Sequence, residues 1–142
     1  MEKHCRLLIV QMCVAVVMFA MVSFNVSYCQ AAQWEKVAES TEQTVEIDAS
    51  SVEWVEYPEL GRNIVCWYKY IEKDKSSNVY HCAFRETNGA PEYAIFEKIS
   101  FDGEGNQIDH QGTSTPDNSV YRPVVPGSDG EQFFQIAKRY AK

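Results

Sequence analysis

Two cysteines and a histidine are the residues of this chain best suited by type and spacing to do chemistry. Cys66 and Cys82 are 16 residues apart, and His81 directly precedes Cys82. This is not the spacing of a Cys-x-x-Cys redox site. Neighbouring residues of a strand point to opposite faces, so His81 and Cys82 are poorly placed to bind one ion, and His110 is the only further histidine after residue 31. The sequence therefore predicts neither a redox nor a metal site here, and no cofactor.

A second candidate is the acidic segment 102–106, which reads Asp-Gly-Glu-Gly-Asn. Its oxygen donors suggest calcium, but it lacks the regular donor spacing and the closing glutamate of a calcium loop. No Gly-x-Ser-x-Gly motif occurs, and the carboxylates fall singly on strand faces and in turns, which is typical of a solvated acidic surface. We therefore expect a hairpin turn at 102–106 and no enzymatic activity.

A β-hairpin must position the cysteines and the histidine. Its strands are residues 63–71 and 77–85, joined by the charged turn 72–76. A hairpin symmetric about Asp74 matches side chains across the strands, and a shift of one residue would break every match. It predicts Cys66 opposite Cys82, Tyr68 opposite Tyr80 and Ile64 opposite Phe84 on one face, with Val65 opposite Ala83 and Trp67 opposite His81 on the other.

The first 31 residues have the pattern of a secretory signal, in which a short basic segment precedes an apolar run over residues 7–22. Cys29 and Ala31 are small residues that suit a cleavage site, which predicts cleavage after Ala31. Lipidation of Cys29 is the second interpretation. An uncleaved anchor is the third, since residues 7–28 are long enough to span a bilayer. All three place residues 32–142 outside the cytoplasm, in the periplasm, the cell envelope or the medium.

Charge and cysteine count narrow the function further. The chain has a formal net charge of −7, of which the first 31 residues contribute +1, so residues 32–142 carry −8. This charge opposes binding to nucleic acid or to an anionic membrane. A membrane contact is expected only through the N-terminal segment, if that segment is uncleaved. Cys66 and Cys82 remain after residue 31. Because they face each other in an exported domain, they favour a disulfide, and two buried thiols are the alternative.

Alternating apolar and polar residues predict further strands near residues 34–38, 44–48, 52–57 and 93–101. Simple alternation places four apolar residues of the last strand on one face, namely Tyr93, Ile95, Ile99 and Phe101.

One helix closes the predicted fold. Ser128 and Glu131 have the Ser-x-x-Glu spacing of a capping box at its start. Its apolar stripe must be buried against the sheet, and consists of Phe133, Ile136, Ala137 and Tyr140, widened by Phe134. The predicted fold class is therefore α+β, a small antiparallel β-sheet meander packed against one C-terminal helix.

The aromatic content exceeds what a single sheet face under one helix requires. The opposite face of the hairpin carries Val65, Trp67, Ile71 and His81. Either this face curls into a second core, or it is a surface for a protein partner or a second copy of the chain. The polar segment 111–118 is a further candidate for contact with a protein.

The order of the segments resembles that of a known family. It runs from Trp34 through Ile-Asp-Ala-Ser-Ser-Val at 47–52, Val-Cys-Trp-Tyr-Lys-Tyr at 65–70 and Phe-Asp-Gly-Glu-Gly at 101–105 to Tyr-Arg-Pro-Val-Val-Pro-Gly-Ser at 121–128. Across residues 34–141 the chain resembles the surface-adhesin protein E family of small exported bacterial envelope proteins. The resemblance implies a small antiparallel sheet on a C-terminal helix, and binding to host or matrix proteins. Many members have a cysteine in the final helix, and residues 133–142 have none, so the resemblance leaves Cys82 to pair with Cys66.

Two functions from different classes follow as expectations. The first is a non-enzymatic exported binding module that contacts a protein through the aromatic face or through segment 111–118. The alternative is a structural envelope protein that associates with itself and binds no external ligand. A secreted enzyme is the third class, and the sequence offers it no nucleophile–base arrangement.

Overall fold

Strands β4 (Gly61–Glu72) and β5 (Ser77–Thr87) form the hairpin around which the sheet is built. The computed structural model describes residues 31–142. Its pairing of β4 with β5 matches the predicted register at all five predicted pairs, from Ile64 opposite Phe84 to Tyr68 opposite Tyr80. The symmetric turn is confirmed as well, because Glu72 and Ser76 close it with a hydrogen bond from the Glu72 N–H to the Ser76 carbonyl (2.9 Å).

The predicted signal segment, including the lipidation site at Cys29, lies outside the described residues except for Ala31. Residues Ala31–Lys142 form one compact unit. Within this unit, no helix has the length and apolar character needed to cross a membrane.

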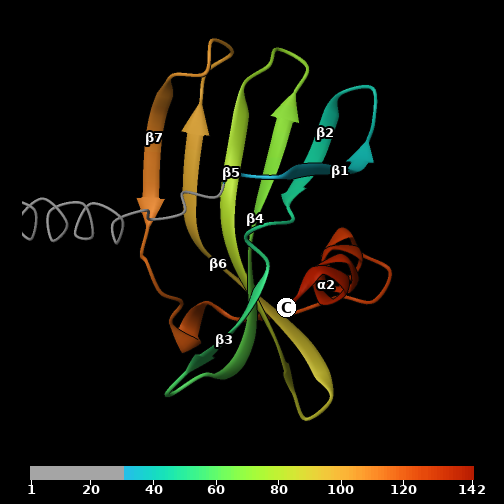
Figure 1. Ribbon diagram of the computed structural model, residues 1–142, viewed down its shortest axis with the longest axis vertical. Helices are drawn as coiled ribbons and strands as arrows, with labels where there is room; N and C mark the ends of the chain where they lie inside the picture. The colour runs from blue at the N-terminus through green and yellow to red at the C-terminus, as the bar shows by residue number, and fades with distance from the viewer. Residues whose placement is uncertain (1–30) are drawn as a thin grey trace, which may run out of the picture. The chain divides into compact units, whose positions relative to one another are not determined.

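All the strands belong to one antiparallel sheet, in the order β1-β2-β4-β5-β6-β7, with β3 added beside β4 and β8 beside β6 (Figure 1). This arrangement and the single helix at the end confirm the predicted α+β fold, a β-meander packed against a C-terminal helix. The remaining strands are β1 (Trp34–Glu39), β2 (Gln43–Asp48), β3 (Glu53–Tyr57), β6 (Ala90–Phe101), β7 (Gln107–Gly112) and β8 (Arg122–Pro123).

Strand β4 has two different neighbours along its outer side. Its second half, residues 68–72, pairs with β2, whereas its first half, residues 61–65, pairs with β3. Between them the Ser51 hydroxyl accepts a hydrogen bond from the Trp67 N–H (3.0 Å), which would otherwise have no strand to bond. Strand β6 is shared in the same way by β7 and β8.

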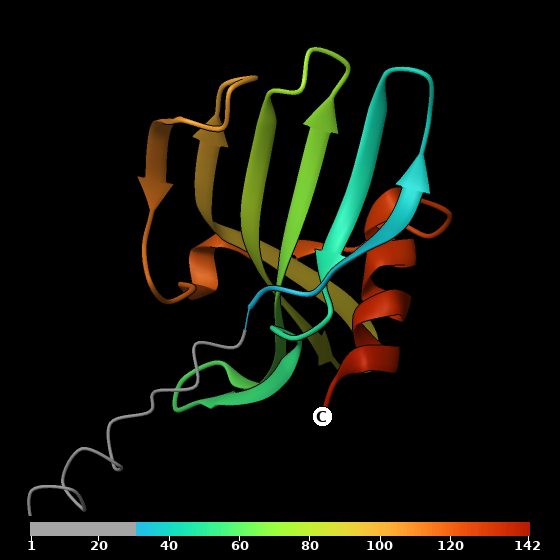
Figure 2. The same cartoon turned by 45° about the horizontal axis from the view of Figure 1, so that its top comes forward.

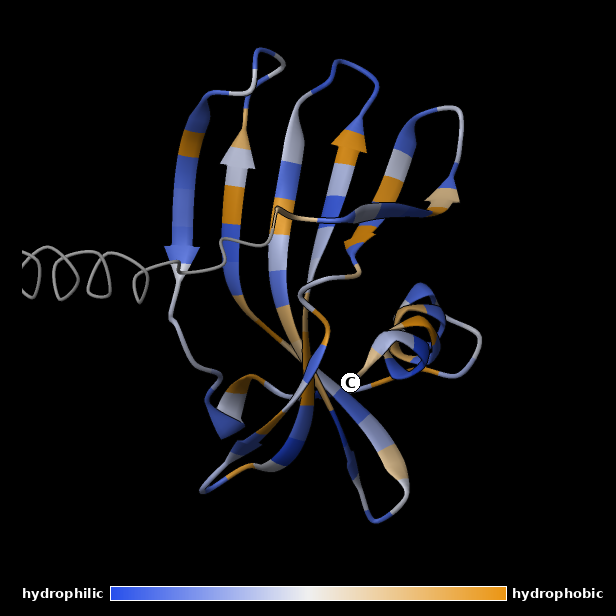
Figure 3. Cartoon of the chain, in the orientation of Figure 1, coloured by the Kyte–Doolittle hydropathy of each residue, from blue (hydrophilic) through white to orange (hydrophobic). Residues whose placement is uncertain are grey.

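Helix α2 (Asp129–Tyr140) begins at the predicted cap. The Ser128 hydroxyl accepts from the Glu131 N–H (3.4 Å), and the Glu131 carboxylate accepts from the Gly127 N–H (2.7 Å). In the expected capping box the glutamate would bond the N–H of Ser128, but that N–H donates to Val125. The helix lies beside the end of the sheet that carries β1 and β2, away from β7 (Figure 2). Its hydrophobic and hydrophilic bands separate as an amphipathic helix requires (Figure 3).

The sheet has an apolar core on each face. The core under α2 contains Ile64, Cys66, Tyr68, Cys82 and Phe84 from the hairpin with Phe134, Ile136 and Ala137 from the helix. The opposite core contains Val65, Ala83, Ala94, Phe96 and Tyr121.

The face that carries Trp67 was predicted to be either a second core or a surface for a partner. For Val65, one of the four residues named on this face, the structure shows a place in the second core. Val65 is 5% exposed, so the prediction that it belongs to a partner surface is wrong: residues of β3 and the chain around Tyr121 cover it. Trp67, Ile71 and His81 remain half-buried.

A β-bulge in β6 changes the faces expected for its apolar residues. Cys82 pairs with Ile95 and His81 with Glu97, so Phe96 is an extra residue on the β6 side. The prediction that Tyr93, Ile95, Ile99 and Phe101 share a face is therefore wrong. Ile99 pairs with Val79, whose side chain lies on the face opposite to that of Cys82.

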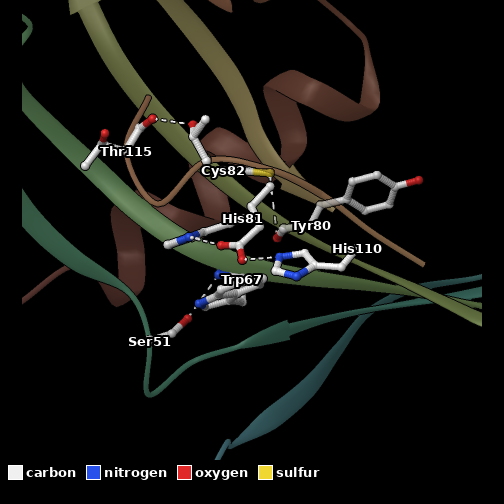
Figure 4. A network of polar contacts seen from close by, with 9 residues as sticks. Ser51, Trp67, Tyr80, His81, Cys82, His110 and Thr115 are labelled. Atoms are coloured by element: carbon white, nitrogen blue, oxygen red, sulfur yellow. Dashed lines mark hydrogen bonds and ion pairs between the residues drawn. The ribbon is translucent and has the colours of Figure 1, made fainter. Parts of the chain in front are cut away.

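The expected disulfide is absent from the structure, in which Cys66 and Cys82 are both free and buried. A disulfide requires the two Sγ atoms to be about 2 Å apart. The thiol of Cys82 instead donates to the carbonyl of Tyr80 on its own strand, with 4.0 Å between Sγ and O (Figure 4). Burial raises the pKa of the Cys82 thiol to about 12, and burial raises the pKa of Cys66 well above its ordinary value. Both thiols are therefore neutral and unreactive at neutral pH.

We expect a thiol reagent to leave Cys66 and Cys82 unmodified in the folded chain at pH 7 and to modify both when the chain is unfolded without reductant. The thiolate is the reactive form, and burial suppresses it. A colorimetric thiol count on residues 32–142, in which Cys66 and Cys82 are the two cysteines of the sequence, measures this with and without denaturant. A count that leaves these two residues unmodified in the denatured chain would mean that they form a disulfide. Fast modification of the folded chain would mean that they are exposed.

Candidate binding pocket between the sheet and helix α2

A pocket of about 300 Å³ lies between the helix-facing side of the sheet and the first turns of α2. The three central strands and the helix each contribute side chains to it, because alternate residues of β4, β5 and β6 project towards the helix. Its lining consists of Tyr68 and Tyr70 from β4, Tyr80, Cys82 and Phe84 from β5, Tyr93 and Ile95 from β6, and Asp129, Gly130 and Phe133 from α2.

The aromatic rings of the pocket meet at steep angles. The rings of Tyr70 and Tyr80 are 5.5 Å apart with an interplanar angle of 89°, and those of Tyr70 and Phe133 are 6.0 Å apart at 81°. Edge-to-face pairs of this kind are favourable arrangements of aromatic rings. Because of these angles, the aromatic rings line the pocket from several directions and are not stacked in parallel.

The position of the helix relative to these rings is fixed by Tyr68. Its hydroxyl donates to the Phe133 carbonyl (2.7 Å), and its ring lies 4.7 Å from the Phe133 ring. Tyr68 is 1% exposed, so this hydrogen bond is shielded from water. This hydrogen bond joins helix α2, which forms one wall of the pocket, to strand β4, which forms another.

The pocket is neutral except at one edge. Burial raises the pKa of Tyr68, and burial followed by nearby groups that include the Asp129 carboxylate raises that of Tyr70. Burial likewise raises the pKa of Tyr80. The phenols are therefore protonated at neutral pH. Among the residues that line the pocket, all of which lie in the described part of the chain, Asp129 is the one with a charged side chain.

Sequence reasoning missed this pocket, although it predicted most of the rings that form it. The hairpin register placed Tyr68 opposite Tyr80, and strand alternation adds Tyr70 to the same face. The sequence pattern assigns these tyrosines to the face under the helix and predicts the functional surface on the opposite face, around Trp67. The usable signal was the concentration of tyrosines on the face that the helix had to cover.

The predicted pair Trp67 and His81 belongs to a polar cluster on the opposite face (Figure 4). The two rings stack at 4.1 Å with an angle of 10°. One oxygen of Glu97 lies 3.3 Å from His81 Nδ1, and the other lies 2.8 Å from His110 Nε2. Because a carboxylate only accepts hydrogen bonds, these two nitrogens carry the protons. The register alone could not bring Glu97 here, since the bulge at Phe96 places it beside His81.

The contacts of this cluster are those of two imidazoles with one carboxylate. In residues 31–142, no three His, Cys, Asp or Glu side chains are grouped so that they could hold a metal ion. The hydrogen-bond partner of each clustered imidazole is Glu97, and neither imidazole bonds a serine, threonine or cysteine side chain. The cluster is a titratable contact between β5, β6 and β7.

We expect the stability of the chain to fall as the pH is lowered below about 6.5, and the variant His81→Gln to lose part of this dependence. Burial lowers the pKa of His81 from its ordinary value of 6.5, and the hydrogen bond to Glu97 offsets this only in part. The unfolded chain therefore binds more protons than the folded one, and stability is present above pH 6.5 and lost as the pH falls through the folded pKa. One such group changes the free energy of unfolding by at most about 1.4 kcal/mol per pH unit.

Urea unfolding of both proteins between pH 5 and pH 8 measures this difference. Glu97, Glu53 and His110 are retained in the variant, so the two proteins differ in the His81 imidazole and in its contact with Glu97. Parallel pH profiles would contradict the assignment to His81.

Comparison with known proteins supplies no relative for this chain. No family model, no curated protein and no solved structure matches it. The resemblance to the surface-adhesin protein E family therefore stays a prediction from the order of its segments, and the pocket is the feature on which a function is argued.

Proposed function

We propose that this chain is an exported, non-enzymatic binding protein of the cell envelope whose ligand site is the tyrosine-lined pocket between the sheet and α2. The observation that carries the proposal is the pocket itself: about 300 Å³, formed in the folded chain and walled by aromatic rings. Ligand sites in proteins are typically apolar cavities of this size or larger with a few polar groups. The hydrophobic segment before residue 32 supports export, and the acidic surface supports a partner that is not nucleic acid.

A binding role fits the groups in the pocket better than catalysis does. The Cys82 thiol is neutral, and the phenols of Tyr68 and Tyr70 are held protonated by burial. Asp129 has no imidazole or thiolate partner in the lining. Such a site recognises shape and charge, and it lacks the activated nucleophile that group transfer requires.

Ligand binding is tested with small compounds of three classes, neutral aromatic, anionic and cationic, added to the isotope-labelled chain. We expect at least one class to shift the NMR signals of Tyr70, Tyr80 and Phe133 in a saturable way. Ile95→Trp should block the site, because Ile95 lines it and is 46% exposed, so a larger side chain has room to lie across the opening. Ile108→Trp is the matched control on β7, where the isoleucine is 66% exposed and does not line the pocket. If no class shifts these signals, the proposal is wrong.

Self-association through strand β7 is the second candidate function. All six residues of β7 are exposed, and it is the last strand on its side of the sheet. An exposed edge has unpaired backbone groups that a second chain could bond. Light scattering of the chain decides this candidate, since a monomer at high concentration would exclude it.

A further inference from the structure

Within the described residues, no lysine or arginine side chain makes a cation–π contact with an aromatic ring that lines the pocket. Four cation–ring contacts occur elsewhere in residues 31–142, and none of them uses a ring of a pocket tyrosine. The nearest lysine by strand pairing is Lys98, which faces Tyr80 in the register but does not line the pocket. No cation of the described residues therefore competes with a ligand for these rings.

The charge at the edge of the pocket is negative. Asp129 and Glu131 both lie in the first turn of α2. The helix terminus contributes about half a positive charge, which two carboxylates outweigh. Two of the N–H groups at this end of the helix are occupied, because the Glu131 N–H donates to the Ser128 hydroxyl and the Gly127 N–H donates to the Glu131 carboxylate. The edge of the pocket thus favours a cation and opposes an anion.

The apolar part of the lining restricts which cations fit. Phe84, Ile95 and the neutral thiol of Cys82 offer no hydrogen-bond acceptors comparable to a carboxylate. A bare ammonium or guanidinium group would have to replace all its bonds to water with those that the Asp129 carboxylate and the tyrosine hydroxyls of the lining can accept. An ammonium group that carries methyl groups has fewer such bonds to lose, and its methyl groups bury apolar surface against the lining.

We propose that the pocket binds an organic cation, a methylated ammonium group, which is held between the tyrosine rings with the Asp129 carboxylate beside it. Aromatic walls with one acidic group are the usual environment for quaternary ammonium ligands. This inference rests on the proposed function, because it names the ligand class of the same site. The same group occurs in small molecules such as choline and in trimethylated lysine side chains.

Calorimetric titration of the purified chain with choline and with 3,3-dimethylbutan-1-ol tests the charge directly. The second compound has the shape of choline with a carbon in place of the charged nitrogen. We expect choline to bind at least about ten-fold more tightly than this neutral analogue. A peptide with one trimethyllysine is the third probe, and whichever of choline and the peptide binds more tightly identifies the source of the cation.

Two pairs of variants locate the effect. Asp129→Asn should reduce the preference for choline, whereas Asp109→Asn makes the same change in net charge on β7, away from the pocket, and should not. Tyr70→Leu should weaken choline binding about ten-fold, whereas Tyr70→Phe keeps the ring and should preserve it. Circular dichroism verifies that each variant is folded, and the Tyr70 pair remains informative if Asp129→Asn weakens the helix.

The outcomes separate this inference from the proposed function. Equal binding of choline and the neutral analogue, or equal effects of the two aspartate variants, would overturn the inference while leaving a ligand pocket. Failure of every compound class to bind at the pocket would overturn both.

Discussion

Replacement of Phe134 by alanine is expected to lower the free energy of unfolding by about 3–5 kcal/mol, the usual cost of removing a buried phenylalanine. Phe134 is 3% exposed and lies in the middle of α2, with its ring 5.7 Å from that of Phe84 on β5. Ile136 and Ala137 are the other two buried residues of the helix, so Phe134 supplies the largest part of its apolar contact with the sheet. Such a loss is a large fraction of the stability of a typical domain.

Urea unfolding of Phe134→Ala and of Gln135→Ala provides the test. Gln135 is the next residue of the same helix and is exposed, so its replacement should change stability by no more than about 0.5 kcal/mol. Phe134→Ala should also weaken ligand binding at the pocket, since the helix residues Asp129, Gly130 and Phe133 form one of its walls. Equal stabilities of the two variants would contradict the docking of α2 through Phe134.

The parts of the fold that sequence reasoning predicted are those set by local pattern. The hairpin register followed from matched side chains on either side of Asp74. The turn fits this register because Lys75 takes a left-handed conformation (φ 70°) and the Asp74 carboxylate accepts from the Ser76 N–H (2.9 Å). The helix start followed from Ser128 and Glu131 for the same reason, since a cap is a contact between residues close in sequence.

The parts that it missed depend on contacts that no local pattern contains. One inserted residue, Phe96, reverses the facing of the rest of β6, and strict alternation cannot anticipate it. Its consequences are large, because Phe96 enters the second core and Glu97 comes to lie between His81 and His110. The pocket was missed for a related reason: its sheet residues and its helix residues are at least 34 positions apart in sequence, the smallest separation being that of Ile95 and Asp129.

Gly112, at the end of β7, lies against the bulge of β6 in a position that fits glycine alone, and here we expect the other large loss of stability. Gly112 has φ +115°, in the region that residues with a side chain rarely adopt. A Cβ built there would overlap the carbonyl oxygen of Phe96 and lie 2.7 Å from the Cα of Glu97. Gly112→Ala should therefore cost about 1–3 kcal/mol for the strained backbone and a further 1–3 kcal/mol or so for the overlap.

Two other glycines of the same region separate these contributions. Gly105 has φ +87° but open space around it, so Gly105→Ala should show the backbone cost alone. At Gly103 a Cβ would lie 2.6 Å from the carbonyl oxygen of Asp74, in a conformation open to other residues, so Gly103→Ala should show the steric cost alone. Urea unfolding of the three variants should give a larger loss for Gly112→Ala than for either of the other two, because Gly112 combines the strained backbone with the overlap.

The Gly112→Ala variant should also disturb the polar cluster of His81, Glu97 and His110, although glycine has no side chain that contacts this cluster. The backbone it would displace belongs to Phe96 and Glu97, and Glu97 holds both imidazoles of the polar cluster. The NMR signals of the His81 and His110 rings should therefore shift in Gly112→Ala and stay unchanged in Gly105→Ala. A loss of stability at Gly112 no larger than that at Gly105, with unmoved histidine signals, would mean that β7 does not approach the bulge of β6 as closely as the structure has it.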